Sequence, residues 1–156
     1  MADELKALMR EVPHPVSVAT VDAAGQKTGL TIVSLVSLSL EPPLVGIAIA
    51  RQAALHELVR AAGAFGVSLL AEDQGALAAH FARGVPPIAL WQGIDARPGP
   101  ATSAPLLEGA LGWLECRTSS ELPVGDHTLF VGEVLAVEPG RAARPLLHLD
   151  QAYTSA

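Results

Sequence analysis

Residues 29–50 read Gly29-Leu-Thr-Ile-Val-Ser-Leu-Val-Ser-Leu-Ser-Leu-Glu-Pro-Pro-Leu44, followed by Val-Gly-Ile-Ala-Ile-Ala50. Both halves are rich in the apolar and β-branched residues that favour strands, and Glu41-Pro42-Pro43 separates them because proline donates no backbone hydrogen bond to a sheet. The first half carries a row of small hydroxyls, at Thr31, Ser34, Ser37 and Ser39. The second half is a continuous apolar run of strand length. The sequence therefore predicts a hydroxyl-bearing strand followed by a buried one.

The same patterns extend along the rest of the chain. Strands are predicted at 16–21, 65–71, 111–119, 128–137 and 146–149, and helices at 2–11, 53–62 and 73–81. Residues 83–103 are irregular, and such a long segment is usually functional or a lid. Helices do not regularly separate the strands, so we expect a small antiparallel barrel with helices at its ends. No repeat or linker divides residues 1–156, which predicts a single domain.

Composition and charge exclude several classes of protein. The chain is 50% hydrophobic, yet its longest strand-like apolar run has seven residues, whereas a membrane helix needs about 18, so no membrane partner is expected. A net charge of −6 with scattered basic residues argues against nucleic acid. A single cysteine, Cys116, and the lack of a signal-peptide pattern predict a cytoplasmic location. The high apolar share also suggests surface buried against a second subunit.

Most motifs for side-chain catalysis are absent. The chain has no glycine-rich dinucleotide or phosphate loop and no nucleophile elbow. His56-Glu57 starts like a zinc motif, but Arg60 stands where the second histidine would be, and no metal site is predicted. Cys116 lies in an apolar strand and is expected to be a plain buried thiol. His80 and His148 are expected to be ordinary half-buried histidines.

Two stretches carry the remaining candidates for chemistry. The hydroxyl row of residues 31–39 is either the exposed face of a strand or a grip for the polar edge of a planar ring such as a flavin. The stretch Gly125-Asp-His-Thr-Leu-Phe-Val-Gly-Glu-Val134 sets His127 after a Gly-Asp turn, facing either solvent or a bound ligand. A histidine can gain or lose a proton near neutral pH, so it can donate a hydrogen bond to a ligand or accept one from it.

In order and spacing, these stretches resemble the flavin reductase-like family. Its members are small FMN- or FAD-binding split barrels, among them the reductase components of two-component flavin-dependent monooxygenases. The resemblance runs from about Val12 to Tyr153 and is most specific at Gly125–Val134. It is also carried by the segments 14–20, 29–34, 37–44, 65–70, 80–82, 114–116 and 145–147, with Ser68 where the family usually has asparagine.

The resemblance implies a mainly β fold, a six-stranded antiparallel Greek-key split barrel of the FMN-binding type. It implies that the flavin ring and ribityl chain are lined by Thr31, Ile32, Val33, Ser34, Leu35, Ser37 and Leu38. It implies that the phosphate is held by Arg51, Gln52, Ala53, Ala54 and Arg83. His127 is implied as the catalytic residue near the nicotinamide, and Tyr153 as a cover over part of the flavin.

The phosphate segment departs from the family pattern. Relatives often carry serine, threonine or lysine there, whereas this chain has Gln52-Ala-Ala-Leu55. Arg51 and the free N–H groups at the start of the 53–62 helix are then expected to hold the phosphate. The departure indicates either a weakly held, exchangeable flavin or a loss of binding.

The implied function is an NAD(P)H-dependent flavin reductase that transfers hydride from the nicotinamide to FMN or FAD and supplies reduced flavin to a partner oxygenase. The family also implies a homodimer with each flavin in a cleft between subunits. Two alternatives stay open on the sequence alone. One is a tight FMN-binding electron-transfer flavoprotein, and the other is a non-enzymatic dimeric split barrel that binds a different planar ligand or none.

Overall fold

The computed structural model describes all of residues 1–156. Its helices are α1 (Ala2–Met9), α2 (Ala54–Ala62), α3 (Gly75–Ala82) and α4 (Pro87–Leu90). Its strands are β1 (His14–Pro15), β2 (Ser17–Ala23), β3 (Gln26–Ile32), β4 (Val36–Leu40), β5 (Pro43–Ala50), β6 (Ala64–Leu69), β7 (Ala96–Pro98), β8 (Pro105–Leu107), β9 (Gly112–Val124), β10 (His127–Pro139), β11 (Leu146–Leu149) and β12 (Ala152–Ser155). The expectation of a mainly β fold is confirmed.

The main sheet has seven strands in the order β3-β2-β6-β9-β10-β5-β4, and all neighbours are antiparallel. Six strands were expected, and the difference arises within residues 29–40, which the sequence pattern joins into one stretch. The backbone leaves the sheet after Ile32 and re-enters it at Val36, so that β3 and β4 stand at opposite edges.

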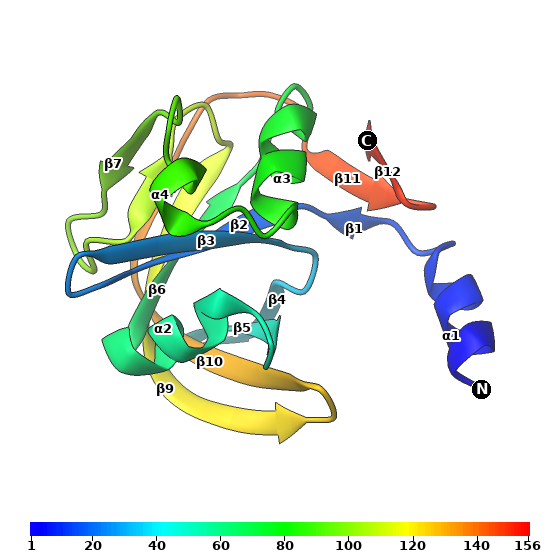
Figure 1. Ribbon diagram of the computed structural model, residues 1–156, viewed down its shortest axis with the longest axis horizontal. Coiled ribbons are helices and arrows are strands. Elements are labelled where there is room, and N and C mark those ends of the chain that lie inside the picture. The colour runs from blue at the N-terminus through cyan, green and yellow to red at the C-terminus, as the bar shows by residue number, and fades with distance from the viewer.

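Residues 33–35 bring these two edges together (Figure 1). With only three residues between them, Ile32 and Val36 lie no more than about 14 Å apart. The Ser34 hydroxyl accepts a hydrogen bond from the N–H of Ala48 and donates one to its carbonyl, each 3.0 Å long. Ala48 lies on β5 beyond Gly46, where pairing with β4 ends. A single side chain therefore takes the place of a neighbouring strand on this part of β5.

The main core lies inside the rolled sheet. Eleven buried residues form it and come from β2, β3, β5, β6, β9 and β10, with Leu55 and Val59 contributed by α2. Phe65 and Phe130 are its largest members, and neither has any exposed surface. Gly132 is required beside them, because a Cβ there would stand 2.6 Å from the Phe65 ring. Helix α2 thus closes one end of the core.

A second core lies on the other face of β2, beneath α3. Phe81 of α3 packs there with Val18 and Leu90, and Phe81 also lies edge-on to Trp91 at 5.3 Å. His80 Nε2 lies 2.7 Å from the Leu90 carbonyl, and the Trp91 indole N–H donates to the Lys27 carbonyl. The segment 83–103, expected to be irregular, therefore packs against the rest of the molecule. It contains α4 and β7.

Helix α1 and the small sheet β1-β11-β12 stand to one side of the molecule (Figure 1). The helix expected at 2–11 is confirmed and ends at Met9. None of its residues is buried, and its apolar residues Leu5, Leu8 and Met9 are exposed. The helices and strands predicted elsewhere are present, with ends displaced by a few residues.

We expect Ser34→Ala to destabilise the protein by about 1–3 kcal/mol, because the half-buried N–H and carbonyl of Ala48 both lose their partner. Urea unfolding without flavin measures this. Ser37→Ala is the matched control, since Ser37 is exposed and its hydroxyl makes no hydrogen bond. Equal free energies of unfolding for the two variants would contradict the role given to Ser34.

Candidate functional site

The turn between β5 and α2 carries an unpaired cation at the start of a helix. Arg51 is exposed, and its guanidinium forms no ion pair and no hydrogen bond within the protein, whereas its backbone N–H donates to the Asp126 carbonyl at 3.1 Å. Ala53 caps α2 with an extended backbone and without a side-chain hydrogen bond. The first N–H groups of α2 and the Arg51 charge are therefore available to an anion.

The β9–β10 hairpin sets His127 beside this turn. Gly125 adopts φ 59°, a left-handed conformation that glycine accepts without strain. His127 lies directly opposite Ala50, the last residue of β5, and its side chain is 44% exposed. Its Nδ1 donates to the Asp126 carboxylate at 2.6 Å, which leaves Nε2 without a partner in the protein.

The charge pattern around this hairpin favours an ionised Asp126. The hydrogen bond and charge of His127 hold the pKa of the Asp126 carboxyl below its usual value, and the charge of Arg51 lowers it further by a smaller amount. An ionised carboxylate fixes the His127 tautomer with the proton on Nδ1. The Nε2 atom of His127 is then free to contact a ligand.

The hydroxyl-rich segment lies beside β5, the strand that pairs with the start of β10 at His127. Ser34 is bonded to Ala48, and Ala48 lies two residues before Ala50 on β5, so the Ser34 and His127 positions are about 7 Å apart along the strand. Val33, Ser37 and Leu38 are exposed, as a surface that meets a ligand requires. The structure thus places Leu38 of the flavin-ring segment on the outer face of β5 and β10 that also carries His127.

Several predicted site residues use their side chains within the fold. Thr31 Oγ1 donates to the Ala78 carbonyl at 2.6 Å and ties β3 to α3. Ile32 is buried in the main core, and Leu35 packs against that core. A ligand can contact these three residues mainly through their backbone groups. The sequence pattern had instead suggested a row of free hydroxyls.

A cavity of about 380 Å³ opens on the other side of the 51–54 turn. Gln52, Ala53 and Ala54 line it, so these predicted phosphate residues lie together. Ala82 and Gly84, the residues on either side of Arg83, also line this cavity. The Arg83 guanidinium itself lies 3.4 Å from His80 Nδ1.

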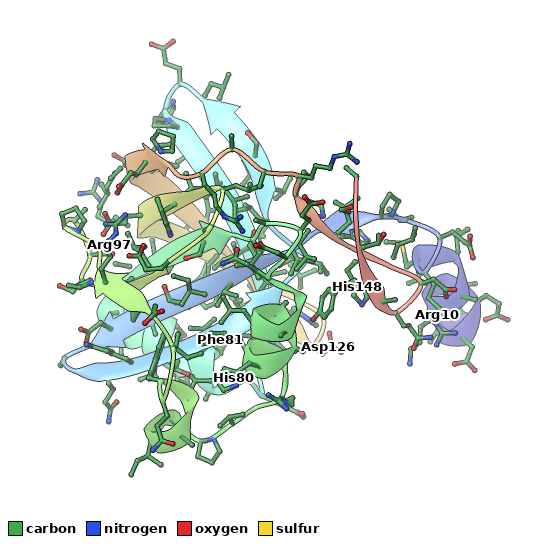
Figure 2. The ribbon with its side chains drawn as sticks, turned by 90° about the horizontal axis from the view of Figure 1, so that it is seen from above. Arg10, His80, Phe81, Arg97, Asp126 and His148 are labelled. Atoms are coloured by element: carbon green, nitrogen blue, oxygen red, sulfur yellow. The ribbon has the colours of Figure 1, made fainter.

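Tyr153 lies apart from this group. It sits on β12 beside Gly75 at the start of α3, whereas Arg83 follows the last residue of the same helix. Its ring contacts His148 edge-on at 5.7 Å, and Figure 2 shows His148 on the side of the molecule that also carries Arg10. Burial raises the pKa of the Tyr153 hydroxyl. Within one chain, the structure does not bring Tyr153 to His127 or Arg51.

His56 is a buried residue of the site that the sequence pattern assigned no role. Its Nε2 lies 2.7 Å from Thr128 Oγ1, its Nδ1 lies 2.9 Å from Glu57 Oε1, and its ring packs edge-on against Phe130. Thr128 directly follows His127, so His56 holds the start of α2 against the strand that carries His127. The one sequence signal for its burial is that His56 lies on the same face of the helix as Leu55 and Val59, which point inward.

Other candidates do not contribute to the site. Cys116 is buried, as expected, and desolvation raises the pKa of its thiol to about 12, which disfavours the thiolate. No cluster of three or more His, Cys, Asp or Glu could hold a metal ion. None of the helices has the length and apolar character needed to cross a membrane.

Comparison with known proteins identifies the family. A family model described as the flavin reductase like domain matches residues 9–156. The chain belongs to this family. The reductase component of 4-hydroxyphenylacetate 3-monooxygenase from Thermus thermophilus is 36% identical over 153 residues, which cover 98% of this chain and 95% of the relative. The NADH:riboflavin 5′-phosphate oxidoreductase of Streptomyces pristinaespiralis is 39% identical over 148 residues, covering 89% and 78%.

Solved structures agree with this membership of the flavin reductase family. The NADH:FAD oxidoreductase SgcE6 of Streptomyces globisporus has a TM-score of 0.92 and 33% identity, and the match covers 97% of this chain and 91% of that one. The resemblance derived from the sequence motifs is therefore confirmed.

In this flavin reductase-like chain we expect Arg51→Ala to weaken FMN about ten- to a hundred-fold, because a charge-assisted contact to the phosphate is lost. The affinity for riboflavin, which has no phosphate, should barely change. Quenching of flavin fluorescence on titration measures both. Arg10→Ala is the control, since Arg10 follows α1 and belongs neither to the 51–54 turn nor to the β9–β10 hairpin. Equal losses for the two flavins, or no loss for either, would remove Arg51 from the site and leave Arg83 as the next candidate.

Proposed function

We propose that the protein is an NAD(P)H-dependent flavin reductase that passes hydride from the nicotinamide to FMN or FAD. The observation that carries this proposal is that Ser34, the unpaired Arg51 and the free Nε2 of His127 all lie around the C-terminal half of β5. Similar proteins are named as NADH:FMN and NADH-dependent flavin reductases, and one solved neighbour is the flavin reductase component of a bacterial two-component tryptophan halogenase. A partner oxygenase that receives the reduced flavin is therefore part of the proposal.

The residues present fit a flavin. Val33, Ser37 and Leu38 offer an exposed surface to the ring, and Arg51 with the start of α2 offers charge and N–H groups to the phosphate. When bound, the flavin accepts the hydride, so the protein needs no nucleophile of its own. The chain's task is to orient the two rings and exclude water. His127, oriented by Asp126, presents Nε2 to the nicotinamide.

The rolled sheet supports the split-barrel architecture. If β3 and β4 are counted as one strand interrupted at Ser34, the seven strands become six around a single core. We extend the proposal to this Greek-key barrel, to residues 1–156 as one domain, and to Tyr153 as a cover for the flavin. The lone buried Cys116 supports a cytoplasmic, reducing location.

An apolar face of the sheet supports the proposed homodimer. A Cβ at Gly46 would stand within 3.2 Å of the side chains of Leu129, Leu38 and Val36, so apolar groups from β10 and β4 meet over β5. Leu122 lies opposite Leu129 and extends this surface onto β9. Such an exposed apolar surface is typical of an interface. This apolar surface continues along the outer face of β5 and β10 to Ala50 and His127. A second copy of the chain bound there would therefore cover the site.

We expect the protein to sediment as a dimer at micromolar concentration, and Leu122→Asp to shift it toward the monomer, because a charge would be buried in the apolar face. Sedimentation velocity measures both. Ile88→Asp is the control, since Ile88 is 87% exposed on α4 and outside this face. A monomeric parent protein, or dissociation of the control variant alone, would contradict the proposed interface.

The test of the proposed function is oxidation of NADH and NADPH with riboflavin, FMN and FAD added in turn. We expect turnover that depends on added flavin. His127→Ala should lower it about five- to 150-fold at saturating flavin, through one lost contact of roughly 1–3 kcal/mol, while flavin affinity changes less. His14→Ala on β1 is the control. A His127→Ala variant that loses flavin yet turns over normally when saturated would overturn the assignment, and a parent without turnover would overturn the function.

A further inference from the structure

The two residues that flank His127 are each tied to the segment that joins β5 to α2. On one side, the backbone carbonyl of Asp126 accepts a hydrogen bond of 3.1 Å from the N–H of Arg51. On the other side, the hydroxyl of Thr128 lies 2.7 Å from Nε2 of His56, which belongs to the first turn of α2. The position of His127 relative to the candidate phosphate site therefore depends on these two contacts.

The direction of the hydrogen bond between His56 and Thr128 follows from the carboxylate beside His56. Nδ1 of His56 lies 2.9 Å from Oε1 of Glu57, and this hydrogen bond holds the pKa of the Glu57 carboxyl below its usual value. An ionised carboxylate only accepts, so Nδ1 of His56 carries the proton and Nε2 accepts the hydrogen bond from the Thr128 hydroxyl. Glu57 thus orients His56 in the way that Asp126 orients His127.

His56 contacts the face of β10 that lies opposite to His127. Successive residues of a strand point to opposite faces, so Thr128 and Phe130 point inward, where both are buried, while His127 points outward. The His56 ring also packs edge-on against Phe130 at 5.4 Å, so His56 contacts both inward residues. Holding Thr128 inward fixes the backbone from which the His127 side chain projects.

Packing alone does not require a polar pair at this place. His56 is 5% exposed and Thr128 is 6% exposed. When two hydrogen-bonded partners are both replaced by apolar groups of the same shape, stability can stay nearly unchanged. A hydrogen bond adds what apolar packing lacks, which is a preferred distance and direction between two atoms.

We propose that His56 is a positioning residue for the reductase reaction, and that by accepting the hydrogen bond of Thr128 it holds His127 in the orientation that meets the nicotinamide. This role rests on the proposed function, to which the nicotinamide contact of His127 belongs. Without the hydrogen bond, the pairing of His127 with Ala50 and its contact with Asp126 remain. His127 then stays at the site but samples more than one orientation and tautomer.

Three variants separate this role from a contribution to stability alone. Thr128→Val and His56→Phe each remove the hydrogen bond, and the double variant replaces both polar partners by apolar groups. In urea unfolding, we expect each single variant to be less stable than the parent and the double variant to regain most of the loss, because no buried polar group is left unpartnered. Turnover at saturating flavin should still fall about three- to tenfold in all three, less than the roughly hundredfold cost of a one-ångström displacement. The affinity for FMN should stay close to that of the parent.

Thr20→Val is the matched control. Thr20 is a fully buried threonine on β2, and its hydroxyl donates to the Pro105 carbonyl at 2.7 Å, the same distance as between Thr128 and His56. Its loss should lower stability and leave turnover unchanged. Thr128→Ser keeps the hydroxyl and should restore the turnover that Thr128→Val loses.

Nuclear magnetic resonance of the histidine side chains gives a readout that needs neither flavin nor activity. In proton–nitrogen spectra of the flavin-free protein at mildly alkaline pH, we expect His127 of the parent to hold its proton on Nδ1, and Thr128→Val to convert it to a mixture of tautomers. Thr20→Val should keep the pattern of the parent. His127→Ala assigns the signal among the five histidines.

Several results would overturn the role of His56. They are a double variant that turns over as fast as the parent, a Thr20→Val variant that is slowed as much as Thr128→Val, an affinity for FMN that falls in step with turnover, and a His127 signal that Thr128→Val leaves unaltered. A parent without NADH oxidation would refute the proposed function instead, and the spectra would still decide whether His56 orients His127.

Discussion

The two hydrogen bonds between Ser34 and the backbone of Ala48 are the constraint on which the rest of the structure depends. A seven-stranded sheet has two edges, and an edge with free N–H and carbonyl groups is open to water and to other strands. Here β3 and β4 are consecutive in the chain and yet stand at opposite edges, so the sheet has to roll until they meet. Ser34 lies between the end of β3 and the start of β4. It bonds to β5 through its side chain rather than through backbone pairing.

The closure sorts the residues of β5 and β10 into two faces with different roles. Ile47, Ile49 and Phe130 point into the core, whereas Ala48, Ala50 and His127 lie on the outer face. The outer residues of β5 have small side chains, so the surface over β5 forms a shallow depression between the neighbouring strands. A planar ring or a second copy of the chain can therefore approach the backbone closely where Leu38 and His127 share this face.

Much of this architecture is predictable from the sequence, because it depends on local patterns. The alternation in β9 and β10, the buried run of β5 and the helical spacing of α3 each follow from burial of one face. The interruption at Ser34 could not be predicted, because its cause is Ala48, on another strand. For the same reason the sequence does not reveal that the Thr31 hydroxyl is already bonded to α3.

The site shows the same division between local and distant causes. Arg51 and His127 are recognisable from their motifs, and the pairing of β5 with β10 makes them neighbours. The contact of His56 with Thr128 joins residues 72 positions apart, and nothing in either local pattern announces it. Burial of His56 at the start of α2 therefore becomes visible only when the helix is packed against β10.

The departure of residues 52–54 from the family pattern has two consequences that belong together. Serine, threonine or lysine at these positions would add groups that bind phosphate, and Gln52, Ala53 and Ala54 add almost none. The same replacement leaves one wall of the neighbouring cavity small and uncharged, so that its lining carries no charge at all. In the proposed site, one exposed cation, Arg51, and the N–H groups at the start of α2 hold the flavin phosphate. Since salt screens exposed charges, a phosphate held by one exposed arginine depends less on ionic strength than one anchored by a cluster of cations.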